Sequence, residues 1–433
     1  MDHSRSSIRG GQRLRHLGSA TLLAAVSVAT FAVLPAAASS PQTGGLGRDG
    51  GGRNRVATWG ASPVVGATSP FPGFVCQAGT GVSDQTVRDV VFTSVGGSQV
   101  RVRLTNSFGT QPLTVGGASI AVAGSGAQGQ PGTLHALTFA GARGIAIPPG
   151  AEALSDPVSM QVSALQDLLV SVFVPGTSSP ATNHFDAQQD NFLSTPGDFT
   201  MTASPAAFTT VNACSYFVDG VSVVAEGRVR GTVVALGDSI TDGTFSTVNA
   251  NRRWPNDLAR RLDARHGPTL SVVDEGIAGN QVLKDSGLAG VNVLARLDRD
   301  VLEQPGARDV ILLEGVNDIG ASQATADQLI PAYEQLIAQV HARGLRIFGG
   351  TLTPFEGAFY WTPAGEQARE AVNHWILTSG AFDGVIDFAG ATANPADPLV
   401  FNPAFDSGDH LHPNDAGYQA MADAVNLDRL LES

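Results

Sequence analysis

The sequence predicts two successive folds, an all-β region followed by an α/β region with a parallel sheet. The chain has 433 residues, which is long for one ordinary domain. Residues 54–230 contain many short β-branched runs separated by Gly and Pro, which is typical of a β-sandwich or jelly roll. Residues 231–433 alternate apolar strands with amphipathic helices, and this pattern predicts a parallel sheet covered on both faces.

The first 38 residues predict a signal peptide. An apolar stretch over residues 20–34 is followed by Pro35 and by the small residues Ala36–Ala38. The stretch is short for a bilayer span, which favours cleavage over a membrane anchor, the alternative interpretation. Residues 39–53, rich in Gly and Ser, then form a flexible linker. We therefore expect a secreted protein without a membrane span. The basic residues before the apolar stretch are Arg5, Arg9, Arg13 and Arg15.

Composition narrows the classes of partner. Hydrophobic residues make up 42% of the chain and charged residues 15%, so a large core can be buried. The formal net charge of −13 argues against a nucleic-acid or anionic-membrane partner. The sequence makes no prediction of oligomeric state.

Two cysteines, Cys76 and Cys214, both lie in the N-terminal half. An even count in an oxidising compartment favours a disulfide between them, although two buried free thiols are the alternative.

The β region begins with a predicted hairpin. Val87–Val95 and Gln99–Leu104 are rich in β-branched residues and are joined through Gly96, Gly97 and Ser98. Further strands are expected at Ala118–Ala123, Gly144–Ile147, Val158–Val162, Leu168–Val174 and Val221–Val229.

The α/β region contains five predicted strands and five predicted helices, assigned from apolar runs and helical spacing. The strands are Thr232–Leu236, Leu270–Asp274, Asp309–Leu313, Leu345–Gly349 and Val385–Phe388. The helices are Arg253–His266, Ala289–Leu302, Ala324–Arg343, Ala364–Thr378 and Asp415–Val425.

Residues that could take part in catalysis follow several of these strands. Gly237-Asp238-Ser239 comes directly after the first strand, and alone it would indicate only a turn. Gly279, Asn317 and the Asp409–Pro413 segment follow other strands. Because ligands of open parallel sheets bind beyond the carboxyl ends of the strands, we expect all of these residues at one edge.

Their roles follow from acyl-transfer chemistry. A serine hydroxyl is a weak nucleophile, so Ser239 needs a general base, and His412 can take its proton. Asp409, three residues earlier, can hold the imidazole in the correct tautomer. Backbone N–H groups of Ser239 and Gly279 and the side-chain amide of Asn317 are candidate oxyanion-hole donors, each worth roughly 3–4 kcal/mol.

A metal site is the competing interpretation. His410 and His412, with Asp406 and Asp409, could supply ligands. Zinc would leave Ser239 without a role, and the sequence contains no HExxH helix. We therefore expect neither a metal nor another cofactor, and His410 is assigned a structural or rim position.

These motifs resemble those of the GDSL, or SGNH, hydrolase superfamily. The resemblance covers residues 232–433 and rests on VVALGDSITDG, EGIAGNQ, GVND and DHLHP, with Ser239, Gly279, Asn317 and His412 at the positions that name the superfamily. It implies a flavodoxin-like three-layer α/β/α fold and ester hydrolysis through an acyl-serine. The stretches TDGTFSTVNANRRWP, RDVILLEGVNDIG and DSGDHLHPNDAGY are similar to a secreted subgroup that includes xylan-associated acylhydrolases.

The expected function is hydrolysis of carboxylic esters, with short acyl groups on a polysaccharide or small glycoside as substrate. A long-chain lipase, and a carbohydrate-binding protein with a degenerate hydrolase domain, are the alternatives. The β region could bind polysaccharide or cap the site. Asp242, Asn249 and Trp254 are candidate pocket residues because they follow the nucleophile turn.

Overall fold

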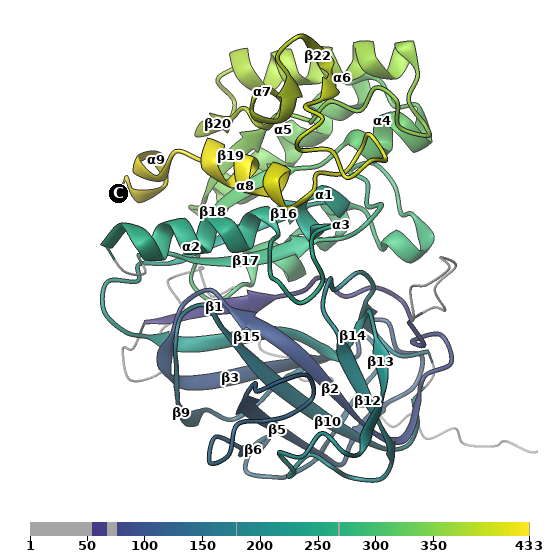
Figure 1. Cartoon of the computed structure of the whole chain (residues 1–433), viewed down its shortest axis with the longest axis vertical. Helices are drawn as coiled ribbons and strands as arrows, with labels where there is room; N and C mark the ends of the chain where they lie inside the picture. The colour runs from purple at the N-terminus through teal and green to yellow at the C-terminus, as the bar shows by residue number, and fades with distance from the viewer. Residues whose placement is uncertain (1–53, 67–75, 179, 267–268, 433) are drawn as a thin grey trace, which may run out of the picture. The chain divides into compact units, whose positions relative to one another are not determined.

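The computed structural model describes residues 54–66, 76–178, 180–266 and 269–432. The predicted signal peptide and the predicted linker lie outside these residues. The described residues form one compact unit, in which an antiparallel β region precedes a parallel sheet with helices (Figure 1). The structure confirms an antiparallel β region followed by a region with a parallel sheet. The boundary between them at 230/231 stays a prediction. In the described part of the chain, no helix is long and apolar enough to cross a membrane.

Two antiparallel sheets form the β region. The first has the order β1-β15-β3-β8 with β9 on β3, and the second has the order β13-β12-β2-β10-β5-β6. Buried valines of both sheets, such as Val91 and Val102, belong to one hydrophobic core. The strands of the first sheet are β1 (Arg55–Gly60), β3 (Gly97–Thr105), β8 (Glu152–Leu154), β9 (Val158–Val162) and β15 (Val218–Ala225). Those of the second are β2 (Val82–Thr93), β5 (Gly117–Val122), β6 (His135–Leu137), β10 (Gln166–Ser178), β12 (Asn191–Pro196) and β13 (Phe208–Asn212).

Two short ladders complete this region. The pair β4 (Leu113–Val115) and β7 (Ile145–Ile147) and the pair β11 (Asn183–His184) and β14 (Ser215–Tyr216) are both antiparallel.

The predicted hairpin at Gly96–Ser98 is wrong. β2 pairs with β10 and β12, whereas β3 pairs with β15, β8 and β9, so the turn carries the chain from one sheet to the other. Tertiary contacts override the local pattern. Ser94 N–H donates to Thr58 O of β1, and a Cβ at Gly96 would lie 2.4 Å from Val162 O of β9.

The parallel sheet has the order β17-β16-β18-β19-β20, which in chain order is 2-1-3-4-5. Its strands are short, and all except the edge strand β20 are largely buried, as the continuous apolar runs predict. They are β16 (Thr232–Gly237), β17 (Ser271–Gly276), β18 (Ala307–Leu313), β19 (Arg346–Gly350) and β20 (Gly384–Ile386).

The helices pack in two groups. α2 (Trp254–His266) contacts α8 (Asp415–Ala424), and α5 (Ala326–Ala342) contacts α3 (Val293–Leu297) and α6 (Pro363–Thr378). Right-handed crossovers place these groups on opposite faces of a sheet with this strand order. The smaller elements are α1 (Ser239–Asp242), η1 (Gly287–Ala289), η2 (Asp298–Leu302), α4 (Val316–Ser322), α7 (Phe388–Thr392), the β21–β22 ladder (Ala393–Asn394 and Asp397–Phe401) and α9 (Leu427–Leu431).

Two expected elements differ from the structure. The helix expected over Ala289–Leu302 is interrupted, because Gly290 has a φ of 75° and Asn292 caps α3 with its side chain. The strand expected to reach Phe388 ends at Ile386, because Asp387 caps α7 by accepting from Gly390 N–H.

The β region packs directly against the parallel sheet. β1 contacts β17, the edge strand of the sheet (Figure 1). Ala57 of β1 belongs to the core of the α/β region, and its N–H donates to Pro305 O at 2.7 Å. A Cβ at Gly60 would lie 2.1 Å from Glu275 Oε1, so the two regions approach closely here.

Candidate active site

The ends of three neighbouring strands bring the predicted residues to one edge of the sheet. Gly237 at the end of β16 is in register with Gly276 of β17 and Leu313 of β18. Ser239 therefore begins α1 next to the loop that carries Gly279 and the helix α4 that carries Asn317. Asp238 caps α1 by accepting from Ile240 N–H at 2.9 Å, which fixes the turn before the serine.

Ser239, His412 and Asp409 lie in a continuous line of hydrogen bonds. His412 Nε2 is 2.8 Å from Ser239 Oγ, and His412 Nδ1 is 2.6 Å from Asp409 Oδ2. The serine and the histidine are 173 residues apart in the sequence. Asp409 Oδ1 also accepts from the N–H groups of Leu411 and His412, so the turn itself orients the carboxylate.

The electrostatics of Asp409 favour its charged form. Burial raises its pKa, but the hydrogen bond and the charge of His412 and the backbone N–H groups outweigh burial and hold the pKa below its usual range. Asp409 is therefore a carboxylate at neutral pH. A carboxylate at this position requires a proton on Nδ1 of His412, which leaves Nε2 able to accept the hydroxyl proton of Ser239.

Three potential hydrogen-bond donors lie on segments that follow the neighbouring strands β16, β17 and β18. Ser239 is the first residue of α1, where a backbone N–H has no partner within the helix. Gly279 has a φ of 78°, which favours glycine, and no acceptor among the described residues takes its N–H. Asn317 Nδ2 donates to Asn280 O at 3.1 Å, which joins the Gly279 loop to α4 and leaves one N–H of the amide free.

The second histidine of the turn has a different partner. His410 Nδ1 lies 2.6 Å from Asp406 Oδ2, away from the Asp409–His412 pair, and its ring contacts the position where a Cβ of Gly357 would be. The described ranges contain no group of three or more His, Cys, Asp or Glu residues that could hold a metal ion.

Comparison with known proteins identifies the family of the C-terminal region. Residues 235–420 match the model of the GDSL-like Lipase/Acylhydrolase family. This part of the chain belongs to the GDSL, or SGNH, hydrolase superfamily. Membership in this superfamily indicates that the protein is an ester hydrolase. No curated protein matches the chain significantly.

Solved structures similar to the chain cover nearly half of it. They include a lipase/acylhydrolase from Enterococcus faecalis, with 18% identity and a TM-score of 0.36, covering 45% of this chain and 92% of that one. A carbohydrate acetylesterase family member from Sinorhizobium meliloti has 18% identity and a TM-score of 0.35, with 45% and 94% covered. The acetyl xylan esterase AlAXEase has 20% identity and a TM-score of 0.34, with 46% and 100% covered.

The GDSL domain contains supporting residues for which the sequence suggested no role. Asp318 accepts from Val282 N–H and Leu283 N–H, both at 2.9 Å, and so holds the end of the Gly279 loop. Tyr360 donates from its hydroxyl to Asn317 Oδ1 at 3.2 Å. Asp318 was visible within the GVND motif, whereas no sequence signal separates Tyr360 from other loop aromatics.

The candidate pocket residues of the sequence lie elsewhere. Trp254 is fully buried and packs against Phe388, so it does not line a pocket, and this prediction is wrong. Asn249 accepts from Asp190 N–H of the β region, and Asp242 is buried beneath the Gly279 loop. One exposed ring lies beside the site: Phe245 is 57% exposed, and its ring centroid is 5.5 Å from that of His412.

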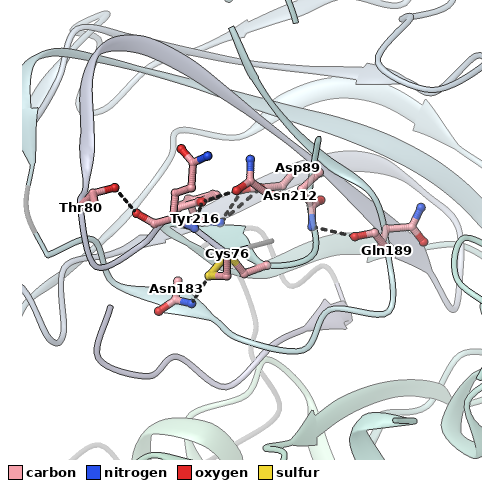
Figure 2. The surroundings of a disulfide bond; sticks show 10 residues. Cys76, Thr80, Asp89, Asn183, Gln189, Asn212 and Tyr216 are labelled. Carbon is pink, nitrogen blue, oxygen red and sulfur yellow. Dashed lines mark hydrogen bonds between the residues drawn. A yellow bond between two sulfur atoms is a disulfide. The ribbon is translucent and has the colours of Figure 1, made fainter. Parts of the chain in front are cut away.

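The predicted disulfide is present in the β region. Cys76 and Cys214 are bonded, with their Cα atoms 5.5 Å apart. Figure 2 shows their surroundings, in which Asn183 Nδ2 donates to Cys76 Sγ and Tyr216 N–H lies 3.2 Å from each carboxylate oxygen of Asp89. Cys214 directly precedes β14, so the bond anchors the β11–β14 ladder.

Proposed function

We propose that this protein is a serine esterase that hydrolyses carboxylic esters through an acyl intermediate on Ser239. The observation that carries the proposal is the line of hydrogen bonds from Asp409 Oδ2 through His412 to Ser239 Oγ, with distances of 2.6 and 2.8 Å. A nucleophile within hydrogen-bond reach of a base that is itself oriented by a carboxylate is the arrangement that acyl transfer requires.

The proposed reaction has two halves. Ser239 Oγ attacks the ester carbonyl carbon while its proton passes to His412 Nε2, and the carbonyl oxygen becomes an oxyanion. Ser239 N–H, Gly279 N–H and Asn317 Nδ2 donate to this oxyanion. The intermediate collapses, the alcohol leaves with the proton from His412, and an acyl-serine remains. Water activated by His412 then attacks the acyl-serine and releases the acid and the free serine.

The proposed substrates are short acyl esters, such as acetyl groups, on a polysaccharide or small glycoside. Their support is the similarity of three sequence stretches around the site to a xylan-associated subgroup. Long-chain acyl esters are the second candidate, which the exposed ring of Phe245 beside His412 favours. A binding protein with a degenerate site fits the geometry poorly, because Asp409, His412 and Ser239 each lie within hydrogen-bonding distance of the next.

We also propose that the protein is secreted and that its two regions are a β-sandwich and a flavodoxin-like domain. The predicted signal peptide and the Cys76–Cys214 disulfide support an extracellular location. The strand order 2-1-3-4-5 supports a flavodoxin-like three-layer domain, and two antiparallel sheets around one core support a β-sandwich in front of it.

Hydrolysis of p-nitrophenyl acetate, butyrate and palmitate by the purified protein and by Ser239→Ala tests the proposal. We expect activity on the short esters and its loss in the variant. A preference for palmitate would move the assignment to a lipase. Activity that persists in Ser239→Ala would exclude Ser239 as the nucleophile. A fluorophosphonate that fails to label Ser239 would also exclude it, and this second test does not depend on the choice of ester.

A further inference from the structure

A buried histidine of the β region reaches the GDSL domain beneath the nucleophile. His184 belongs to β11 and pairs with Ser215 of β14, next to the disulfide. Its Nδ1 lies 3.0 Å from Ser62 O, and its Nε2 lies 3.0 Å from Asp242 Oδ1. Asp242 is the last residue of α1, the helix that begins at Ser239.

Both ring nitrogens of His184 therefore face oxygen atoms. The carbonyl of Ser62 can only accept, so Nδ1 carries a hydrogen. A carboxylate at Asp242 can only accept as well, so Nε2 also carries one, and a ring with two N–H groups is an imidazolium. The charged state agrees with the surroundings: burial lowers the pKa of His184, but the charge and hydrogen bond of Asp242 outweigh it and raise the pKa to about 9.

The second oxygen of Asp242 supports the proposed oxyanion hole. Asp242 Oδ2 accepts from Ala278 N–H at 3.0 Å, and Ala278 directly precedes Gly279. The contact between α1 and this loop is close, because a Cβ at Gly276 would lie 2.3 Å from Asp242 N. One carboxylate thus connects His184 on one side to the oxyanion loop on the other.

We propose that His184 is a positioning residue, which fixes Asp242 by a charged hydrogen bond so that Asp242 holds the Ala278–Gly279 loop in the geometry that stabilises the oxyanion. This inference rests on the proposed function. Without the donor on Nε2, the carboxylate loses the partner of one oxygen inside a buried site, and its orientation toward Ala278 N–H is no longer fixed. The β region then contributes to the reaction through His184, which is buried.

Other charged groups also surround His184. Asp242 of α1, Asp274 of β17 and Asp186 beyond β11 contribute negative charge, and Arg253 before α2 contributes positive charge near Asp274. Asp186 Oδ2 accepts from Thr244 Oγ1, and the guanidinium of Arg253 donates to Asp242 O and to Ala187 O. Apart from Asp242, none of these groups accepts a hydrogen bond from Ala278 N–H, so Asp242 is the group that connects His184 to the loop.

Two similar substitutions of His184 distinguish a role in positioning Asp242 from a role in stability alone. His184→Gln keeps an N–H near the position of Nε2, directed at Asp242, whereas His184→Asn keeps one near Nδ1, directed at Ser62 O. Both remove the cation, so both should lower the melting temperature. We expect His184→Asn to lower kcat on p-nitrophenyl acetate on the order of 10- to 100-fold with KM little changed, and His184→Gln to restore most of the loss.

Each kcat is normalised to the fraction of molecules that a fluorophosphonate labels at the end point, so that unfolded protein does not count. Wild-type kcat should also decline as the pH rises through about 9, and His184→Gln should lack this decline. Equal normalised kcat values in the two variants, high or low, would overturn the inference. Full activity in Ser239→Ala would instead overturn the proposed function on which it rests.

Discussion

The hydroxyl of Tyr360 donates to the side-chain oxygen of Asn317, and this bond fixes which end of the amide is directed at the phenol. Oδ1 is directed at Tyr360 and Nδ2 at Asn280 O, so one N–H of the Asn317 amide remains for the proposed oxyanion hole. Burial, together with nearby carboxylates, raises the pKa of Tyr360 above its usual range, so the phenol keeps its proton and remains a donor. Its ring packs against Phe359, with ring centroids 4.4 Å apart.

Removal of this hydroxyl should reduce turnover more than binding. We expect Tyr360→Phe to lower kcat on the order of 10-fold with KM little changed, because the ring still packs but the amide is free to rotate. Tyr333→Phe is the matched control, since it deletes a buried hydroxyl that donates to Glu314 O behind the site. Steady-state kinetics on p-nitrophenyl acetate would contradict the assignment if both variants lost kcat equally.

Asp409 and Asp406 offer a second matched pair. Each carboxylate lies 2.6 Å from a histidine Nδ1 within one turn, but only the Asp409 histidine reaches Ser239. We expect Asp409→Asn to lower kcat/KM on the order of 1,000-fold or more, and Asp406→Asn to change it only a few-fold. Comparable losses in the two variants would remove the distinction between the two histidines.

The pH profile gives a related prediction. Because the pKa of Asp409 is lowered, its carboxylate stays charged as the pH falls from 7 toward 5. A decline of wild-type kcat/KM at acidic pH would therefore not come from Asp409, and we expect one because an imidazole with protons on both nitrogens cannot accept the proton of Ser239. A flat profile between pH 5 and 8, measured with a soluble ester, would argue against His412 as the base.

The sequence predicted the parallel sheet and the candidate site more closely than it predicted the contacts behind the site. The strands that precede Ser239, Gly279 and Asn317 are largely apolar runs, and their parallel pairing brings the residues that follow them to one edge. The turn at Gly96 was misassigned because a local Gly-rich pattern does not distinguish a hairpin from a corner between two sheets. His184 lies in the polar stretch TNHFDAQQD, and its partner Asp242 is 58 residues away, so only the tertiary structure reveals the pair.

The disulfide should contribute to stability and to the arrangement of β11. It joins residues 138 apart, for which chain-entropy models give on the order of 4–5 kcal/mol. We expect the double variant Cys76→Ser, Cys214→Ser to show a urea midpoint well below that of the wild type. Dithiothreitol should lower the wild-type midpoint toward the same value. An unchanged midpoint in the double variant would mean that the packing of β14 alone holds this ladder.

The stability of the protein should depend on pH through His184. Its pKa is raised from 6.5 to about 9 in the folded protein, so the stabilisation is fully present below pH 6.5 and is lost as the pH rises through 9. The raised pKa values of Asp274, about 7, and Asp186, about 6, place the titration of both acids below this window. Between pH 7.5 and 9.5 the wild type should therefore lose about 2 kcal/mol of unfolding free energy that His184→Asn does not lose. Urea unfolding of both proteins at the two pH values measures the difference directly, and parallel losses would show that His184 is not charged in the folded protein.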